Sequence, residues 1–257
     1  MDLQYASGSL LVWATNNPYT FRCGNASKIR CCLRDRRIMA ALNTRSGIAR
    51  SSMIKAIVDG ARWVIEDHRQ HPGPAVANWS FIADTSTAIP ALDTAVADLR
   101  AAGIPVIVSA GNLEIDACRV SPGNSRGAIV VGASALVNER LPNGVAQLVD
   151  RRSPGTAYGP CIDMYAPGDS VLLPSLDREQ SPISQLWNGT SMSAGYVSGA
   201  AALYLETHPS ATPDEVADEL KNSATINLVR DARTTFSRML YVGTRDTRLL
   251  ARTASRR

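Results

Sequence analysis

The chain of 257 residues is long enough for one large α/β domain or two small ones, and its 45% hydrophobic content is that of a globular protein with a core. The formal net charge is only +4, and many of the arginines lie in residues 30–37 and in a tail that starts at residue 244. No aromatic residues are interleaved with these arginines, and no apolar run is long enough to cross a membrane. We therefore expect neither nucleic-acid binding nor a membrane span.

Residues 1–37 show no sustained periodicity and mix Gly, Asn, Ser, Cys and Arg, which predicts an atypical, poorly ordered lead-in. The apolar stretch at residues 10–14 is too short for the core of a signal peptide, so no export signal is visible and the localisation stays unassigned. The cysteines are odd in number, have no CxxC spacing and are not clustered with the histidines, so we expect no zinc site. They are Cys23, Cys31, Cys32, Cys118 and Cys161.

After the lead-in, helical and strand patterns alternate. Apolar residues at helical spacing predict a helix over residues 53–66, and residues 75–81 predict a short buried strand. A second helix is expected over residues 89–102, followed by a β-branched strand over residues 104–110 of the kind that is covered on both faces. Strand, helix and strand in this order imply a right-handed crossover and a parallel sheet.

The second half of the chain continues this pattern. Residues 128–133 predict another buried strand, and residues 161–166 predict a weaker one. The helix expected over residues 190–207 is rich in Ser, Ala and Gly, so it can approach its neighbours closely and we expect it to be central and buried. A capping box at residues 212–215, with proline at the first helical position, opens an amphipathic helix that reaches about residue 222.

A serine stands at the mouth of the predicted central helix. In Gly189-Thr190-Ser191-Met192, Ser191 lies beside the unpaired N–H groups and the positive dipole of a helix N-terminus. This place suits a nucleophile whose attack on a carbonyl group creates an oxyanion. Taken alone, however, Gly-Thr-Ser before a helix is more often only an N-cap.

Asn112 is the second candidate, because the buried strand over residues 104–110 ends in Gly111-Asn112. The side chain would project beyond the carboxyl edge of a parallel sheet, where α/β proteins place their sites, and could donate to an oxyanion. The alternative is an asparagine that only accepts an unusual backbone conformation.

Together with the segments around them, these residues resemble the C-terminal portion of the subtilisin-like serine peptidases, the peptidase S8 family, and most of all its proteinase K and aqualysin branch. The matches follow one another in family order. They comprise residues 42–64, 74–80, 108–112, 116–118, 121–122, 131–134, 158–168, 188–192, 201–206 and 209–213. The resemblance implies a three-layer α/β sandwich with a mainly parallel sheet, from which the N-terminal part of the fold is missing.

The resemblance also implies an endopeptidase that forms an acyl-enzyme on Ser191, with the Asn112 carboxamide donating to the oxyanion. A peptide or protein substrate would lie as an added strand along residues 80–83. The substrate-binding residues implied in this way are Ser80, Phe81, Ile82, Ser109, Ala110, Gly111, Ser121, Pro122, Gly189 and Thr190.

Further expectations follow from the same resemblance. Cys118 and Cys161 stand where that branch pairs two cysteines, which implies a disulfide and an ancestor built for an oxidising compartment. The family is typically secreted and some members use calcium, but no calcium ligands are identified in this chain, and no other cofactor is expected. We expect a monomer.

The chain departs from the family in its catalytic base. It contains neither the Asp segment nor the His segment of the triad. His68 and His71 follow the first predicted helix and His208 precedes a proline, so none of them is expected to act as the base. Residues 84–86, Asp-Thr-Ser, look like the Asp motif but follow the substrate strand and lack its glycine, so we interpret them as a loop.

Two more departures concern packing. The Gly-Gly pair that lets a substrate backbone approach is replaced by Ile82-Ala83, which should crowd the groove. Gly195-Tyr196 replaces the Pro-His pair of the family on the helix after the nucleophile.

Three hypotheses remain. The chain is an endopeptidase homologue whose activity depends on a further segment, a catalytically silent domain kept for binding, or a truncated product. In each case we divide it into a lead-in (1–37), a partial peptidase domain (38–243) and a basic tail (244–257).

Overall fold

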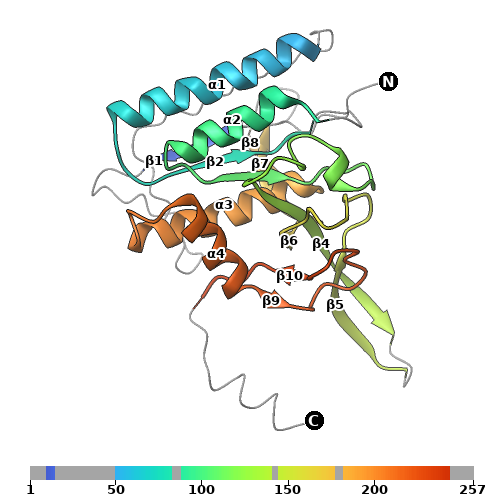
Figure 1. Ribbon diagram of the computed structural model, residues 1–257. Coiled ribbons are helices and arrows are strands. Elements are labelled where there is room, and N and C mark those ends of the chain that lie inside the picture. The colour runs from blue at the N-terminus through green and yellow to red at the C-terminus, as the bar shows by residue number, and fades with distance from the viewer. Residues whose placement is uncertain (1–9, 15–49, 83–87, 141–143, 177–181, 244–257) are drawn as a thin grey trace.

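The computed structural model describes residues 10–14, 50–82, 88–140, 144–176 and 182–243 (Figure 1). Its helices are α1 (Arg50–Gln70), α2 (Pro90–Ala101), α3 (Thr190–Thr207) and α4 (Pro213–Ser223), with a short 3-10 helix η1 (Ala117–Arg119). Its strands are β1 (Leu10–Ala14), β2 (Ala75–Trp79), β3 (Val106–Ser109), β4 (Ile129–Arg140), β5 (Ala146–Arg152), β6 (Met164–Pro167), β7 (Val171–Leu176), β8 (Pro182–Trp187), β9 (Thr225–Ile226) and β10 (Arg238–Met239).

The main sheet has eight strands in the spatial order β1-β2-β3-β4-β6-β10-β9, with β5 paired to β4. Strands β2, β3, β4, β6 and β10 all run parallel to one another. Strands β1, β5 and β9 are antiparallel additions, and β7 and β8 form a separate hairpin. The sheet is therefore mainly parallel, as predicted.

Helices cover both faces of the sheet, because successive residues of each buried strand point to opposite sides. In β2, Ala77 and Trp79 pack into the cluster that contains α1 and α2, whereas Val76 packs into the cluster that contains α3 and α4. Figure 1 shows α1 and α2 on one side of the sheet and α3 on the other. This arrangement confirms the three-layer α/β fold.

The helices and buried strands occur where their patterns predict them. Helix α3 begins and ends as expected, and the capping box of α4 forms in full, since Thr212 and Glu215 each accept a hydrogen bond from the other's backbone N–H. The correction concerns β4, which continues to Arg140 and pairs with β5 as a hairpin that projects from the body (Figure 1). Residues 136–140 of β4 are more exposed than residues 129–135. They therefore lack the buried apolar run from which the first part of the strand was predicted.

The expected disulfide is present. Cys118, in η1, is bonded to Cys161, in the turn before β6, with their Cα atoms 5.2 Å apart. The bond joins two segments that lie 43 residues apart in the sequence. Cys23, Cys31 and Cys32 lie outside the described residues.

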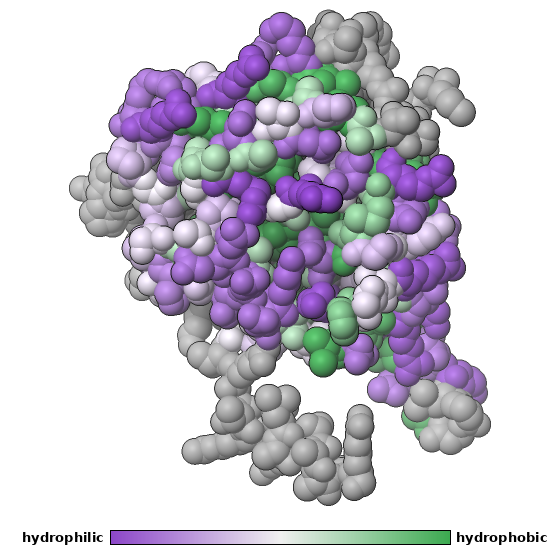
Figure 2. Space-filling view, in the orientation of Figure 1, coloured by the Kyte–Doolittle hydropathy of each residue, from purple (hydrophilic) through white to green (hydrophobic). Residues whose placement is uncertain are grey.

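Several other expectations also fall outside the described residues, namely those on most of the lead-in, on Ala83, on residues 84–86 and on the basic tail. Among the residues that are described, no helix combines the length and the apolar character needed to cross a membrane. On the face shown in Figure 2, polar surface predominates, and apolar surface forms small separate patches.

Tyr165 of β6 is a buried group whose ionisation is coupled to stability. Its side chain is completely buried, and its hydroxyl donates to the carbonyl oxygen of Ala232. Burial raises the pKa of this phenol to about 12, an effect that the nearby Arg152 partly opposes. The folded state therefore holds the phenolic proton more tightly than the unfolded chain does.

We expect the free energy of unfolding to decrease by about 2 kcal/mol between about pH 9 and about pH 11.5 through this one group. The contribution is complete below the unfolded pKa of about 10 and is lost as the pH rises toward the folded value. The Tyr165→Phe variant should lack this part of the loss when urea unfolding is measured at both pH values. An equal loss in the variant and the unmodified chain would contradict the assignment.

Candidate active site

The candidate site lies where the carboxyl ends of β2 and β3 meet the amino end of α3. Ser80 directly follows β2, and Gly111 and Asn112 follow β3 after one intervening residue. Thr190 and Ser191 form the start of α3. Because β2 and β3 are parallel, their carboxyl ends open on the same edge of the sheet, and the helix N-terminus is directed to that edge.

Thr190 fixes the side chain of Asn112. Its backbone N–H and its hydroxyl both donate to Oδ1 of Asn112, with a donor–acceptor distance of 3.0 Å in each case. The same hydroxyl oxygen accepts the N–H of Gly111 at 3.1 Å. Because two donors converge on Oδ1, the carboxamide is held with its Nδ2 donor on the other side, and within the described residues Nδ2 has no acceptor.

Gly189 lies beside this donor. Its φ of 136° falls in the region that favours glycine, and a Cβ at this position would stand 2.9 Å from Nδ2 of Asn112. A side chain would therefore both strain the backbone and press against the carboxamide. The glycine leaves the Asn112 amide group open toward the mouth of α3.

Ser191 is tied to Ser80 in both directions. The Ser191 hydroxyl donates to the carbonyl oxygen of Ser80 over 3.3 Å, and the Ser80 hydroxyl donates to the carbonyl oxygen of Ser191 over 3.1 Å. Ser80 is buried, whereas Ser191 is partly accessible. The two serines thereby join the end of β2 to the first turn of α3.

The predicted substrate strand packs closely against the loop after β3. The carbonyl oxygen of Phe81 accepts the Ser109 hydroxyl at 3.4 Å, and the Phe81 ring lies 5.4 Å from the Trp79 ring. Two side-chain atoms of Ile82 lie 2.9 and 3.0 Å from the place that a Cβ on Gly111 would occupy. Ile82 thus fills the space in front of Gly111.

The remaining predicted contact residues have other roles in the structure. Ala110 is completely buried, and its N–H donates to the Val131 carbonyl as part of the sheet. Ser121 is buried; its hydroxyl accepts the Ile89 N–H and donates to the Asn124 side chain. Its bond to Pro122 is cis. These hydrogen bonds join Ser121 to the segment that opens α2 and not to the loop after β3.

A buried arginine that sequence reasoning did not single out supports the loop of Asn112. The side chain of Arg152 is 4% exposed and donates to the Thr156 carbonyl at 2.7 Å and to the Glu114 carboxylate at 3.0 Å. Glu114 lies two residues after Asn112, and its N–H donates to the Gly155 carbonyl. An arginine that follows Asp150 and Arg151 at the end of a strand resembles a surface residue, so the sequence carries no signal for this role.

The histidines lie away from Ser191. His68 borders a hollow of about 470 Å³ that Ala75, at the amino end of β2, also lines, and burial lowers the pKa of His68. The two ends of this strand are about 13 Å apart at 3.3 Å per residue, and Ser191 is at the other end. His208 stacks on Tyr204 at the carboxyl end of α3, and His71 is exposed at the end of α1. Within the described residues no histidine contacts Ser191.

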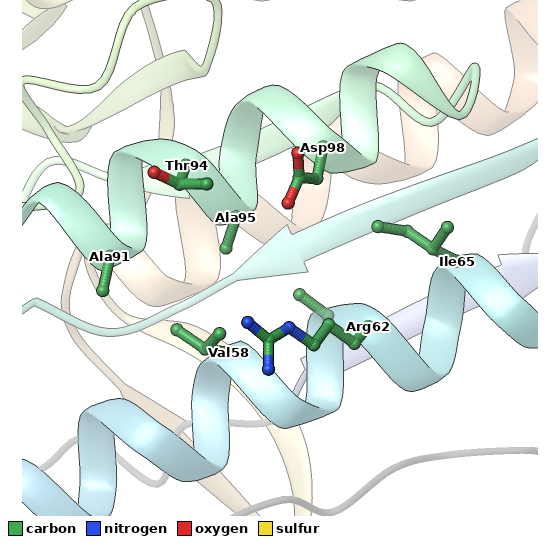
Figure 3. A pocket seen from close by; sticks show the side chains of 8 residues that line it. Val58, Arg62, Ile65, Ala91, Thr94, Ala95 and Asp98 are labelled. Carbon is green, nitrogen blue, oxygen red and sulfur yellow. The ribbon is translucent and has the colours of Figure 1, made fainter.

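Another cavity in the described residues lies away from the candidate site. A cavity of about 140 Å³ lies between α1 and α2, on the far face of the sheet from α3, with Arg62 and Asp98 at its rim (Figure 3). No cluster of three or more His, Cys, Asp or Glu side chains in the described residues is arranged to hold a metal ion.

Sequence comparison relates the chain to serine peptidases. The sequence model of the subtilase family matches residues 38–245. The extracellular serine proteinase of Thermus sp. strain Rt41A is 40% identical over 177 residues, which are 69% of this chain and 38% of that protein. Alkaline serine exoprotease A of Vibrio alginolyticus is 31% identical over 191 residues, which are 74% of this chain and 32% of that protein. The chain spans about a third of the length of these curated relatives.

Solved structures agree with this result. A cold-adapted subtilisin-like serine proteinase aligns with a TM-score of 0.62 and 30% identity, over 74% of this chain and 62% of that chain. A protease of Pseudoalteromonas arctica aligns with a TM-score of 0.58 and 26% identity, over 72% of this chain and 56% of that chain. These alignments confirm the subtilisin-like architecture.

The bridging role of Thr190 predicts a difference between two conservative variants. Thr190→Val keeps the shape of the side chain but leaves the buried Gly111 N–H without an acceptor, so it should lower the free energy of unfolding by about 1–3 kcal/mol. Thr190→Ser keeps the hydroxyl and should cost less than half of that. Urea unfolding of both variants measures the difference, and equal losses would refute the role of the hydroxyl.

Proposed function

This chain belongs to the subtilase family of serine peptidases, and on that premise we propose that residues 38–243 carry the nucleophile and the oxyanion-binding part of an endopeptidase site. The reaction is the hydrolysis of a peptide bond through an acyl-enzyme on Ser191. The observation that supports this most strongly is the fixed carboxamide of Asn112, held by Thr190 next to the first turn of α3.

Few groups take part in the proposed reaction. The oxygen of Ser191 attacks the substrate carbonyl carbon, and the carbonyl oxygen becomes negatively charged. The Nδ2 group of Asn112 donates to that oxygen, and the positive end of the α3 dipole stabilises the charge. Collapse of this intermediate breaks the peptide bond, and the leaving amine takes up the proton removed from Ser191. Water then attacks the acyl group on Ser191, which releases the carboxylic acid and restores the serine hydroxyl.

The step that the described residues do not accomplish is the removal of the Ser191 proton. The Ser80 carbonyl holds this proton by a hydrogen bond, but an amide oxygen is too weak a base to take it up. No described histidine is in contact with Ser191. We therefore propose that efficient turnover needs a base from outside the described residues and that these residues alone sustain only a slow residual reaction.

The proposed substrate is a peptide or protein that binds in an extended conformation along residues 80–82. Its main chain would pair with the backbone of residues 80–82 and with the loop after β3. The side chain before the cut would reach toward Gly111, where Ile82 already lies. This crowding favours small side chains at that subsite.

The same contact supports a second candidate function. Ile82 crowds the space in front of Gly111, and no described residue supplies a base to Ser191, which also fits a silent subtilase domain that binds a partner without cleaving it. The two candidates differ in whether Ser191 can be acylated at all.

A fluorophosphonate probe tests the proposed nucleophile, because it reacts with an activated serine. We expect slow labelling that is abolished in Ser191→Ala and accelerated about tenfold by added imidazole, which replaces the base from solution. Asn112→Ala should slow the assisted labelling by about 10²–10³, a magnitude that is known from subtilisin itself.

Labelling is followed by intact-mass measurement, with a cooperative melt to show that each variant is folded. Labelling that persists in Ser191→Ala would refute the assignment of the nucleophile. A folded chain that stays unlabelled with imidazole would favour the silent binding domain.

The position of Ile82 predicts a change in selectivity. Ile82→Gly should increase the imidazole-assisted labelling by a peptide phosphonate with a phenylalanine side chain about tenfold relative to one with an alanine side chain. Ile82→Val is the matched control and should give a smaller change. Equal effects of Ile82→Gly on both probes would show that this side chain does not limit the subsite.

A further inference from the structure

A chain of buried polar side chains leads from the middle of α3 to the candidate nucleophile. Asn78 of β2 is 7% exposed, Ser80 is 6% exposed and Ser198 of α3 is 2% exposed. They lie in the layer between the sheet and α3, which is otherwise formed by apolar residues such as Val76 and Val197. Polar groups in such a layer are costly unless each finds a partner.

The hydrogen bonds between these side chains all point from Ser198 toward Ser191. The Ser198 hydroxyl donates to Oδ1 of Asn78 at 3.2 Å and, from the same proton, to the Ala194 carbonyl at 2.8 Å. The Nδ2 group of Asn78 donates to the Ser80 hydroxyl oxygen at 2.9 Å. The Ser80 hydroxyl in turn donates to the Ser191 carbonyl.

The carboxamide of Asn78 links the two serines through both of its polar atoms. Its Oδ1 accepts from Ser198, and its NH₂ group donates to Ser80. The hydroxyl oxygen of Ser80 is thereby used as an acceptor, and its single proton is left for Ser191. Ser198 is thus connected, through two intermediate side chains, to the first turn of α3.

We propose that Ser198 and Asn78 are positioning residues for Ser191. They orient the Ser80 hydroxyl, which fixes the Ser191 peptide group and keeps the Ser191 hydroxyl in reach of the Ser80 carbonyl. This inference rests on the proposed function, because it takes Ser191 to be the nucleophile. Misplacement of a reacting group by about 1 Å is enough to slow a reaction by about 10²-fold.

The helix offers a matched control. Ser193 is also a completely buried serine of α3, two residues from Ser191, but its hydroxyl donates to the carbonyl oxygens of Ala166 and Pro167. Removal of the Ser193 hydroxyl deletes similar hydrogen bonds but leaves the hydrogen bonds that connect Ser198 to Ser191 in place. A variant at this position separates loss of stability from loss of positioning.

The experiment compares Ser198→Ala, Asn78→Ala and Ser193→Ala by the rate of imidazole-assisted fluorophosphonate labelling and by the melting temperature. We expect all three to lower the melting temperature, but only the first two to slow the labelling, by about tenfold. Asn78→Gln, which keeps the carboxamide but displaces it, should not restore the rate. Equal slowing in Ser193→Ala, or no slowing in Ser198→Ala, would overturn the proposal.

A second readout does not depend on reactivity. The ¹³Cβ and amide resonances of Ser191, observed by NMR, should shift in Ser198→Ala and remain unchanged in Ser193→Ala. Unchanged Ser191 resonances in Ser198→Ala would overturn the positioning role. An unlabelled parent chain with shifted resonances in Ser198→Ala would instead keep the positioning role and reject only the proposed nucleophilic function.

Discussion

The candidate site depends on two hydrogen bonds made by the hydroxyl of Thr190. It accepts the N–H of Gly111 and donates to the side chain of Asn112, so one buried side chain joins the end of a strand to the beginning of a helix. Both partners lie 78 or 79 residues away along the chain. Without this hydroxyl, the Gly111 N–H would lose its acceptor, and the Asn112 carboxamide would keep only the hydrogen bond from the Thr190 N–H.

The residues of the candidate site carry no formal charge. Its members are serines, a threonine, an asparagine and glycines, and Arg152, the one buried charged residue among the described residues, contacts Glu114 in the loop after Asn112. Negative charge at the site would therefore be stabilised by oriented dipoles rather than by a cation. Such dipoles are effective only when they are already aligned, which explains why so many hydrogen bonds serve to fix so few atoms.

The fold could be predicted from the sequence wherever local pattern and burial coincide. The β-branched run of β3, the small residues of α3 and the capping box of α4 each specify their element through short-range physics. The strands β1, β5, β7, β8, β9 and β10 were not predicted. Strands β5 and β9 are largely exposed, and β1 and β10 pair with strands that are distant in the sequence. Ser191 and Asn112 were proposed from motifs, but the path from Ser198 to Ser80 joins residues up to 120 positions apart and leaves no local pattern.

The bond between Cys118 and Cys161 gives the molecule a dependence on its redox surroundings. Closing a loop with a sequence separation of 43 removes conformational freedom from the unfolded chain that is equivalent to about 4 kcal/mol of stability in the chain-entropy description. That amount is a large share of the stability of an ordinary domain. The disulfide form of this chain is therefore expected to tolerate heat and destabilising mutations better than the form with free thiols.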